Sequence, residues 1–403
     1  MRTGSADGPV DRGASNSIPQ PRVPFLDLQP VHEPLKPRLI DDFAALIDGG
    51  MFVNGTPVPT FEDAFATYCG VTFAVGVASG LDALRLGLLA AGLERGEEVI
   101  LPAQTFVATL EAVVQAGGRP VLVDVDEEDC NLDVDAARTA VTPRTRCVLP
   151  VHLYGQMADM RALAALAESG GLFIIEDACQ AHGAVRDGLR PGEAGLAAAF
   201  SFFPAKNLGA FGDAGALITP REDLADAARA LREHGQRRKY EHALEGYTAR
   251  LDTIQALVLL RKLPLLDRWN EERRSAARFY SETLEGVGDI RVPNVPEGSD
   301  PVWHLYVIHT SRPVELGRHL ADRGVGTGRH YPQPVHLTPA YARLGHREGA
   351  FPVAERLAAR CLSLPIFPGI REDQLHAVAT GVAAFFRGPT RRKAASKSSP
   401  VAG

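Results

Sequence analysis

Residues 172–180, LFIIEDACQ, and residues 199–213, AFSFFPAKNLGAFGD, are the two stretches that decide how this chain is interpreted. In the first, a short apolar run ends in the adjacent acids Glu176 and Asp177; in the second, an apolar run leads to Lys206 and a glycine-rich loop. Short apolar runs bounded by polar residues are typical of buried parallel strands. Similar runs alternate with segments of helical period along the chain, which predicts an α/β fold with a mostly parallel sheet and crossover helices.

Outward from these two stretches, the pattern predicts two units. Strands are expected at residues 73–78, 99–101, 120–124, 147–151, 172–176, 198–203 and 214–218, and helices at 81–92, 158–169 and 223–233. Beyond Arg250 we expect long helices at 251–262 and 264–287, a strand at 303–309, and helices at 314–323 and 373–386. This change predicts a large α/β domain over residues 23–262 and a smaller C-terminal α+β domain over 263–387. Residues 1–22 and 388–403 have the composition of disordered tails.

Composition excludes several classes of protein. With 403 residues and 45% hydrophobic content, the chain can bury a substantial core. The net charge of -6 provides no general attraction to nucleic acid or to anionic lipid. Five scattered cysteines disfavour both a disulfide framework and a metal site, so we expect a reducing cytoplasm and no metal. No apolar run approaches the roughly 20 residues of a membrane helix.

Polar residues follow several expected strands, at the sheet edge where open α/β proteins bind ligands. Nucleotide-binding glycine motifs and the metalloprotease H-E-x-x-H motif are absent from the sequence. At Ser79-Gly80, a strand turns into a helix, where a glycine lets backbone N–H groups approach a phosphate and Ser79 can donate its hydroxyl. An ordinary capped helix start is the equally supported alternative.

Asp177 and Lys206 carry the remaining signals. A carboxylate at the end of a buried strand is able to pair with a protonated pyridine nitrogen, although many acids at this position cap helices. A lysine between an apolar strand and a glycine-rich loop is expected to be partly desolvated, which lowers its pKa and suits Schiff-base formation. A solvated surface lysine is the common alternative.

Taken together, these motifs resemble the DegT/DnrJ/EryC1/StrS family of sugar aminotransferases. The resemblance runs through VPFLDL (23–28), GTPV (55–58), FE (61–62), SGLDAL (79–84), GEEVI (96–100), TF (105–106), VHLYG (151–155), EDACQAHG (176–183), the Lys206 segment, RLD (250–252), HYP (330–332) and LSLP (362–365). So many ordered motifs over nearly the whole folded chain make the resemblance specific. It implies the fold of type I pyridoxal-phosphate enzymes.

The resemblance also implies roles for individual residues. Lys206 matches the catalytic lysine that holds pyridoxal 5'-phosphate covalently, Asp177 the partner of the pyridine nitrogen, and Gln180 the contact of the phenolic oxygen. Phe106 matches the aromatic residue that stacks on the ring. The phosphate would be held by Ser79, Ser201 and the backbone of Gly80 and Leu81.

Two positions depart from the family pattern. Residues 212–215 read Gly-Asp-Ala-Gly, where the family often has Gly-Asp-Gly-Gly, and this wording is also found in some members that act at sugar C3. Thr248 stands where the family usually has an asparagine that reaches across a homodimer interface to the phosphate of the neighbouring subunit. A threonine hydroxyl reaches less far. We still expect a homodimer with shared active sites and Thr248 among the cofactor-binding residues.

The implied reaction is ping-pong transamination in deoxyamino-sugar biosynthesis. Glutamate is the expected amino donor, pyridoxamine 5'-phosphate the intermediate form of the cofactor, and a nucleotide-linked keto-sugar the acceptor, with a 3-keto sugar favoured over a 4-keto sugar. Arg250 is a candidate for the donor carboxylate or the nucleotide phosphate, and an interface salt bridge is its alternative role. His330 and Tyr331 are candidates for the sugar site, with a packed loop as the alternative.

Other interpretations stay open at this point. An enzyme of the same fold that resembles 3-amino-5-hydroxybenzoate synthase keeps the lysine, whereas the dehydratases of deoxysugar synthesis replace it with histidine. A non-catalytic paralogue with a regulatory or structural role is the alternative from another class. His152, His182 and Cys179 are expected to be buried structural residues.

Overall fold

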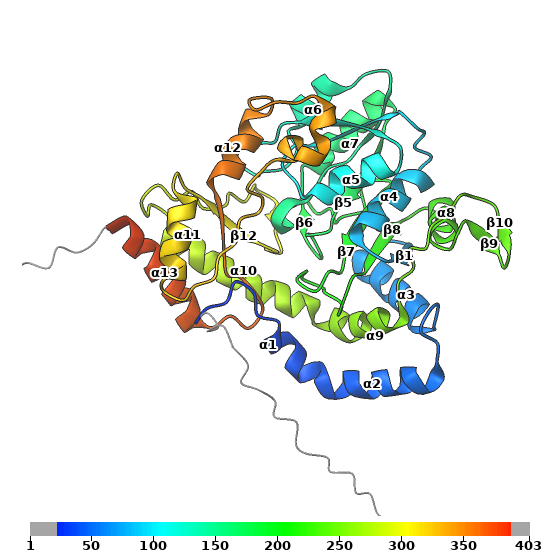
Figure 1. The fold of residues 1–403 in the computed structure, drawn as a ribbon, viewed down its shortest axis with the longest axis horizontal. Helices are drawn as coiled ribbons and strands as arrows, with labels where there is room; N and C mark the ends of the chain where they lie inside the picture. Colours follow the sequence, from blue (N-terminus) through cyan, green and yellow to red (C-terminus); the bar gives the residue numbers. More distant parts are fainter. Residues whose placement is uncertain (1–21, 388–403) are drawn as a thin grey trace, which may run out of the picture.

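The computed structural model describes residues 22–387, and a seven-stranded sheet forms its centre (Figure 1). The strands are β1 (Phe73–Val77), β2 (Glu98–Pro102), β3 (Arg119–Val123), β4 (Thr145–Val148), β5 (Phe173–Asp177), β7 (Ala197–Ser201) and β8 (Gly215–Thr219), in the spatial order β1-β8-β7-β5-β4-β2-β3. The strands β3, β2, β4, β5 and β7 run parallel, and β8 is antiparallel to both of its neighbours. The predicted mostly parallel α/β sheet is confirmed.

Helices cover both faces of the sheet, which explains why its strands are rich in apolar residues on both sides. They are α3 (Pro57–Cys69), α4 (Gly80–Ala90), α5 (Val107–Gln115), α6 (Val134–Ala140), α7 (Met160–Gly170), α8 (Glu222–Arg232) and α9 (Thr253–Lys262). Successive residues of one strand serve two separate cores. In β7, Phe200 packs with Phe61 and Phe65 on one face, whereas Ala199 packs with Leu84 on the other.

A smaller layer forms around the long helix α10 (Leu266–Leu284). It contains α11 (Pro313–Ala321), α13 (Glu372–Arg387) and the antiparallel pair β12 (Tyr306–His309) and β13 (Cys361–Leu364). Tyr280 and Tyr306 lie in its core. Val23, from the start of the described chain, joins the same core and pairs with Val325. The exact division of the chain into two domains at residue 262 stays a prediction.

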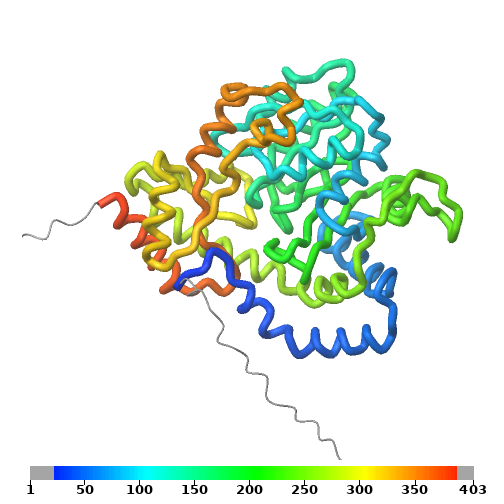
Figure 2. Tube along the Cα trace, viewed as in Figure 1, coloured from blue at the N-terminus to red at the C-terminus, as the bar shows by residue number. Residues whose placement is uncertain are grey.

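Further segments connect these two layers. The helix α12 (Pro352–Arg360) belongs to the C-terminal part of the chain, but its Leu357 packs into the core of the large sheet. The N-terminal helices α1 (Gln29–His32) and α2 (Lys36–Gly49) run along the lower edge of the molecule in the view of Figure 2. Short pairs join β6 (Val185–Arg186) with β11 (Ser299–Asp300), and β9 (Gln236–Arg238) with β10 (Glu241–His242).

Some elements differ from the expectation. The strand expected at 147–151 ends at Val148, and Val151 makes only an isolated bridge to Asp177. The strand expected at 303–309 begins at Tyr306, because Trp303 has a φ of 48°, outside the strand region. The expected tail residues 1–21 and 388–403 lie outside the described residues.

Across residues 22–387, no helix has both the length and the apolar character that a membrane span requires. The same residues contain no cluster of histidine, cysteine and acidic side chains suited to a metal ion. All five cysteines are free thiols.

Candidate active site

Lys206 lies in a tight turn that follows β7. Its backbone N–H donates to the carbonyl oxygen of Phe203 at 2.8 Å. A Cβ at Gly209 would lie 2.4 Å from the carbonyl oxygen of Pro204, so the chain can fold back after Lys206 only with glycine there. Burial lowers the pKa of the Lys206 ammonium, while Cys179 and Asp177 act in the opposite direction. A larger fraction of this amine is therefore neutral than in an exposed lysine.

Asp177, the last residue of β5, presents a buried carboxylate with both oxygens engaged. Thr109 Oγ1 donates to Oδ2 at 2.7 Å, and the backbone N–H of Cys179 donates to Oδ1 at 3.2 Å. Thr105 Oγ1 lies 2.8 Å from Thr109 Oγ1. Asp177 is only 6% exposed, so these donors replace the water that its carboxyl group would otherwise bind.

The start of α4 packs tightly against the ends of β7 and β8. A Cβ at Gly80 would lie 2.7 Å from both Cys179 Sγ and Ser201 Cβ, and one at Gly215 would lie 2.4 Å from the carbonyl oxygen of Ser79. Two glycines thus bring Ser79 and Ser201 to one place. Ser79 is the N-cap of α4, because its Oγ accepts from the Asp82 N–H at 3.0 Å. The capped start and the close backbone approach therefore coexist.

Gln180 connects the sheet edge to the loop that contains His330 and Tyr331. Its Oε1 accepts from the Tyr154 N–H at 2.8 Å, and its Nε2 donates to the Tyr331 hydroxyl at 3.3 Å. The Tyr154 hydroxyl in turn donates to the carbonyl oxygen of His330. Phe106, the N-cap of α5, lies 5.5 Å from the Tyr331 ring centroid to centroid and is 51% exposed.

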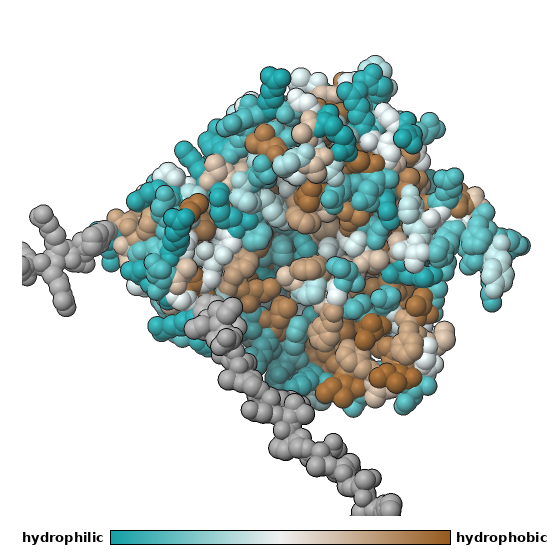
Figure 3. Space-filling model, viewed as in Figure 1, coloured by the Kyte–Doolittle hydropathy of each residue, from teal (hydrophilic) through white to brown (hydrophobic). Residues whose placement is uncertain are grey.

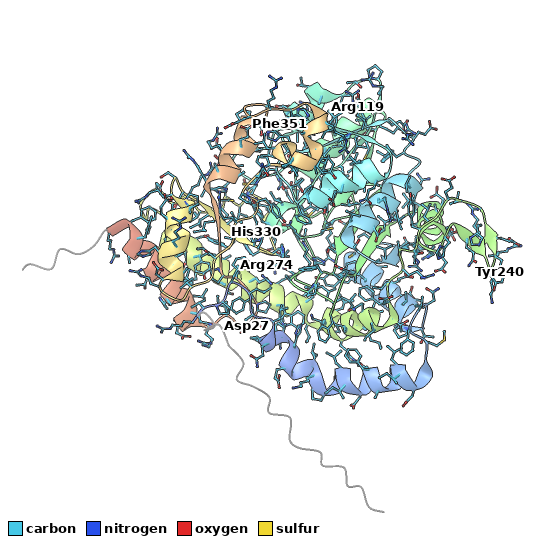
Figure 4. All side chains as sticks on the ribbon, in the orientation of Figure 1. Asp27, Arg119, Tyr240, Arg274, His330 and Phe351 are labelled. Atoms are coloured by element: carbon cyan, nitrogen blue, oxygen red, sulfur yellow. The ribbon has the colours of Figure 1, made fainter. Side chains whose placement is uncertain are left out.

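His330 lies near the middle of the molecule, between the two layers (Figure 4). Its Nδ1 is 2.8 Å from Ser363 Oγ on β13, and its ring stacks on Phe25 at 5.5 Å. Burial, with a smaller contribution from Lys206, lowers the pKa of His330 to about 4. The ring is neutral at physiological pH, so it can offer a hydrogen-bond donor or acceptor without a net charge.

The structure does not bring Thr248 into this group. Thr248 is exposed, and its Oγ1 lies 3.2 Å from His234 Nε2 of the same chain. Arg250 bridges to Val77 at the end of β1, and its Nη1 donates to Glu233 Oε1 at 2.8 Å. Arg250 therefore forms a salt bridge within one chain, which differs from the interface salt bridge expected as its alternative role.

Comparison with known proteins fits this geometry. The DegT/DnrJ/EryC1/StrS aminotransferase family matches residues 35–383. The chain belongs to this family. It is 47% identical over 360 residues to the dTDP-3-amino-3,4,6-trideoxy-alpha-D-glucose transaminase of Streptomyces venezuelae, covering 89% of this chain and 95% of that protein. It is 44% identical to the "Pleiotropic regulatory protein" of Geobacillus stearothermophilus, covering 91% and 99%.

A solved structure agrees with the family assignment. The crystal structure of S. venezuelae DesV in complex with a ketimine intermediate superposes with a TM-score of 0.88 at 47% identity, covering 90% of this chain and 98% of that one. The fold is therefore that of the type I pyridoxal-phosphate enzymes. The chain is a pyridoxal-phosphate-dependent sugar aminotransferase.

The residues of this aminotransferase fit its cofactor. A lysine with a lowered pKa, a buried carboxylate and two serines that Gly80 and Gly215 bring together suit the aldehyde, the ring nitrogen and the phosphate of pyridoxal phosphate. The first N–H groups of α4 have no partners within the helix and favour an anion. Lys206, Asp177, Ser79 and Ser201 would hold the cofactor.

Sequence reasoning missed several residues of this region. Thr109, Tyr154 and Ser363 each hold a predicted site residue by a hydrogen bond. Tyr154 and Ser363 stand in the motifs VHLYG (151–155) and LSLP (362–365), whereas Thr109 lies outside the motifs.

The two histidines expected to be structural differ from each other. His152 is fully buried and bonded on both ring nitrogens, with Nε2 2.8 Å from Glu176 Oε2 and Nδ1 accepting from the Ala158 N–H at 3.2 Å. His182 bonds the Ser201 carbonyl through Nε2, but its buried Nδ1 has no partner among the described residues. The structural interpretation therefore describes His152 fully and His182 in part.

Proposed function

We propose that this enzyme transfers an amino group from glutamate to a nucleotide-linked keto-sugar, with a 3-keto sugar preferred over a 4-keto sugar, in deoxyamino-sugar biosynthesis. The observation that carries the proposal is the grouping of Lys206, Asp177 and Gln180 at one edge of the sheet, next to the loop that contains His330 and Tyr331. The Streptomyces relative, whose name specifies a 3-amino sugar, supports the 3-keto preference.

The chain's own residues divide the work. Pyridoxal phosphate, when bound, supplies the electron sink that lets an amino group leave one substrate and join another. Lys206 Nζ takes a proton from the amino donor in the first half of the reaction and gives a proton to the amino-sugar product in the second half. It can act as a base because burial lowers the pKa of its amine. Asp177 would pair with the ring nitrogen. Gln180 would contact the phenolic oxygen, and it holds Tyr331 in place by a hydrogen bond.

Substrate recognition is assigned to three residues. The neutral ring of His330 and the hydroxyl of Tyr331 offer hydrogen bonds to sugar hydroxyls. Arg250 is assigned to the donor carboxylate or to the nucleotide phosphate, and in either role it must share its guanidinium with Glu233. The planar guanidinium suits both carboxylate and phosphate.

We further propose a homodimer that acts in the cytoplasm, with Thr248 directed at the neighbouring subunit's phosphate. An exposed apolar surface supports the dimer: brown residues gather over α2 and α9 in Figure 3. Exposed members of this surface are Ile40, Ile47, Met51, Phe52 and Ile254. Contiguous exposed apolar surface of this kind is typical of protein interfaces. The free thiols of all five cysteines support a reducing compartment.

The alternatives make different predictions in one experiment. The purified protein is incubated with pyridoxal phosphate, glutamate and either a dTDP-linked 3-keto hexose or its 4-keto isomer, and the amino-sugar and 2-oxoglutarate are quantified by mass spectrometry. Lys206→Ala is the matched control. Equal amounts of the two products with the 3-keto sugar support the proposal.

Other outcomes of this experiment would refute separate parts of the proposed function. Faster turnover of the 4-keto isomer would overturn the regiochemistry alone. Binding of pyridoxal phosphate without amino transfer to either sugar would favour a synthase-like reaction of the same fold. Absence of any Lys206-dependent cofactor binding would favour a regulatory or structural paralogue, an interpretation that the name of the Geobacillus relative keeps open.

A further inference from the structure

A short chain of hydroxyl groups ends on the carboxylate of Asp177. Thr109 Oγ1 donates to Asp177 Oδ2 at 2.7 Å, and Thr105 Oγ1 lies 2.8 Å from Thr109 Oγ1. Both threonines are buried, with 2% of Thr105 and none of Thr109 exposed. Thr109 lies in the first turn of α5, and Thr105 directly precedes Phe106, the N-cap of that helix.

The direction of these hydrogen bonds follows from proton counting. An ionised carboxylate only accepts hydrogen bonds, and a threonine has a single O–H. Thr109 therefore donates its single O–H to Asp177 Oδ2. In the contact between the two threonines, Thr105 must donate and Thr109 must accept. Two O–H dipoles then point the same way, toward Asp177, and each strengthens the next.

Both oxygens of Asp177 are thereby held. The torsion that turns a carboxylate is broad and imposes no orientation of its own. Here the Cys179 N–H holds Oδ1 at 3.2 Å while Thr109 holds Oδ2. Removing the Thr109 hydroxyl leaves one weak donor, and the carboxylate can turn.

We propose that Thr109, supported by Thr105, is a positioning residue that holds the Asp177 carboxylate in the orientation needed to keep the cofactor's ring nitrogen protonated. This inference rests on the proposed function, in which Asp177 faces that nitrogen. Thr109 itself does not touch the reacting atoms. Its effect is to fix the partner of the ring, as outer hydrogen bonds fix the ligands of metal sites.

The test uses the full-length enzyme with pyridoxal phosphate labelled with nitrogen-15 in the ring, observed by NMR across a pH series. Thr109→Val removes the hydroxyl and keeps the shape, and Thr109→Ser restores the hydroxyl. Thr219→Val is the matched control, because Thr219 is also fully buried and bonds the Leu196 carbonyl at 2.8 Å, away from this site.

We expect the ring nitrogen to lose its proton at lower pH in Thr109→Val than in the wild type, with a glutamate half-reaction about 10-fold slower. Thr109→Ser should return both readouts close to the wild type, and Thr219→Val should leave both unchanged even if it melts earlier. Thr105→Val should produce a smaller shift in the same direction.

Two results would overturn the inference: a ring-nitrogen titration in Thr109→Val that matches the wild type, or a shift of equal size in Thr219→Val. If Thr109→Val does not fold, Thr105→Val decides the question, and an unshifted titration there would refute the proposal. Failure of the wild type to bind pyridoxal phosphate through Lys206 would instead refute the proposed function. The two failures are therefore distinguishable.

Discussion

Replacing Gly80 with alanine tests whether the start of α4 must approach Ser201 as closely as the structure shows. A Cβ at this position lies 2.7 Å from both Cys179 Sγ and Ser201 Cβ, and 3.2 Å from Ser201 Cα. Carbon atoms pack at about 3.5–4.0 Å, so the helix start has to retreat by roughly 1 Å. Overpacking of this kind costs about 1–3 kcal/mol. If that strain falls on the phosphate-bound state, pyridoxal phosphate binds about 5- to 150-fold more weakly.

The assay is the dissociation constant of pyridoxal phosphate, measured by equilibrium dialysis against the apoenzyme, with a thermal melt of each variant. Gly49→Ala is the control, because a Cβ at the end of α2 meets nothing within 4 Å. Adding Cys179→Ala to Gly80→Ala removes one of the two clashes and should restore part of the affinity. Wild-type affinity and an unchanged melt in Gly80→Ala would refute the argument.

Two further predictions concern buried polar groups. Burial lowers the pKa of His309 to about 4, against an ordinary value of about 6.5. Between pH 6.5 and pH 4 the unfolded chain therefore binds a proton that the folded chain does not, so the stability of the fold decreases as the pH falls through this range. The free energy of unfolding, measured with urea, should therefore fall between neutral pH and pH 5 by about 2 kcal/mol less in His309→Gln than in the wild type. Equal decreases in the two proteins would contradict this prediction. Gln180→Leu leaves the Tyr154 N–H without its acceptor and frees Tyr331, which should cost about 1–3 kcal/mol and raise KM for the keto-sugar more than it weakens cofactor binding. An unchanged melt together with an unchanged KM would show that the hydrogen bonds of Gln180 to Tyr154 and Tyr331 contribute neither to stability nor to substrate binding.

The strands of the central sheet could be predicted because each is a local signal. Burial on both faces gives β2 and β5 a short apolar run each, and in β5 the acids Glu176 and Asp177 at its end mark the sheet edge. The spatial order was not predictable, since the antiparallel placement of β8 between β1 and β7 depends on which edges meet after folding. The strand β13 was missed because its four residues pair with β12 over a long sequence separation.

The candidate site likewise contains residues that the sequence predicts and contacts that it does not predict. Lys206, Asp177 and Gln180 stand in motifs, and their neighbourhood follows from the parallel strands before them. The connection from Gln180 to Tyr331 spans 151 residues, and the contact of Thr109 with Asp177 spans 68. Tertiary packing brings such pairs together, and neither the spacing of the two residues in the sequence nor their residue types predict the contact. The conformation of Tyr154, with a φ of 61°, is likewise invisible in a sequence pattern.

Lys206 is the residue proposed to hold pyridoxal phosphate and then to move the proton. The most direct measurement is the visible absorbance spectrum of the purified protein with pyridoxal phosphate, before and after glutamate, recorded beside Lys206→Ala. A band that requires Lys206 and disappears on addition of glutamate is the predicted result. A spectrum that is the same in wild type and Lys206→Ala, or a Lys206-dependent band that no amino donor changes, would contradict this role of Lys206.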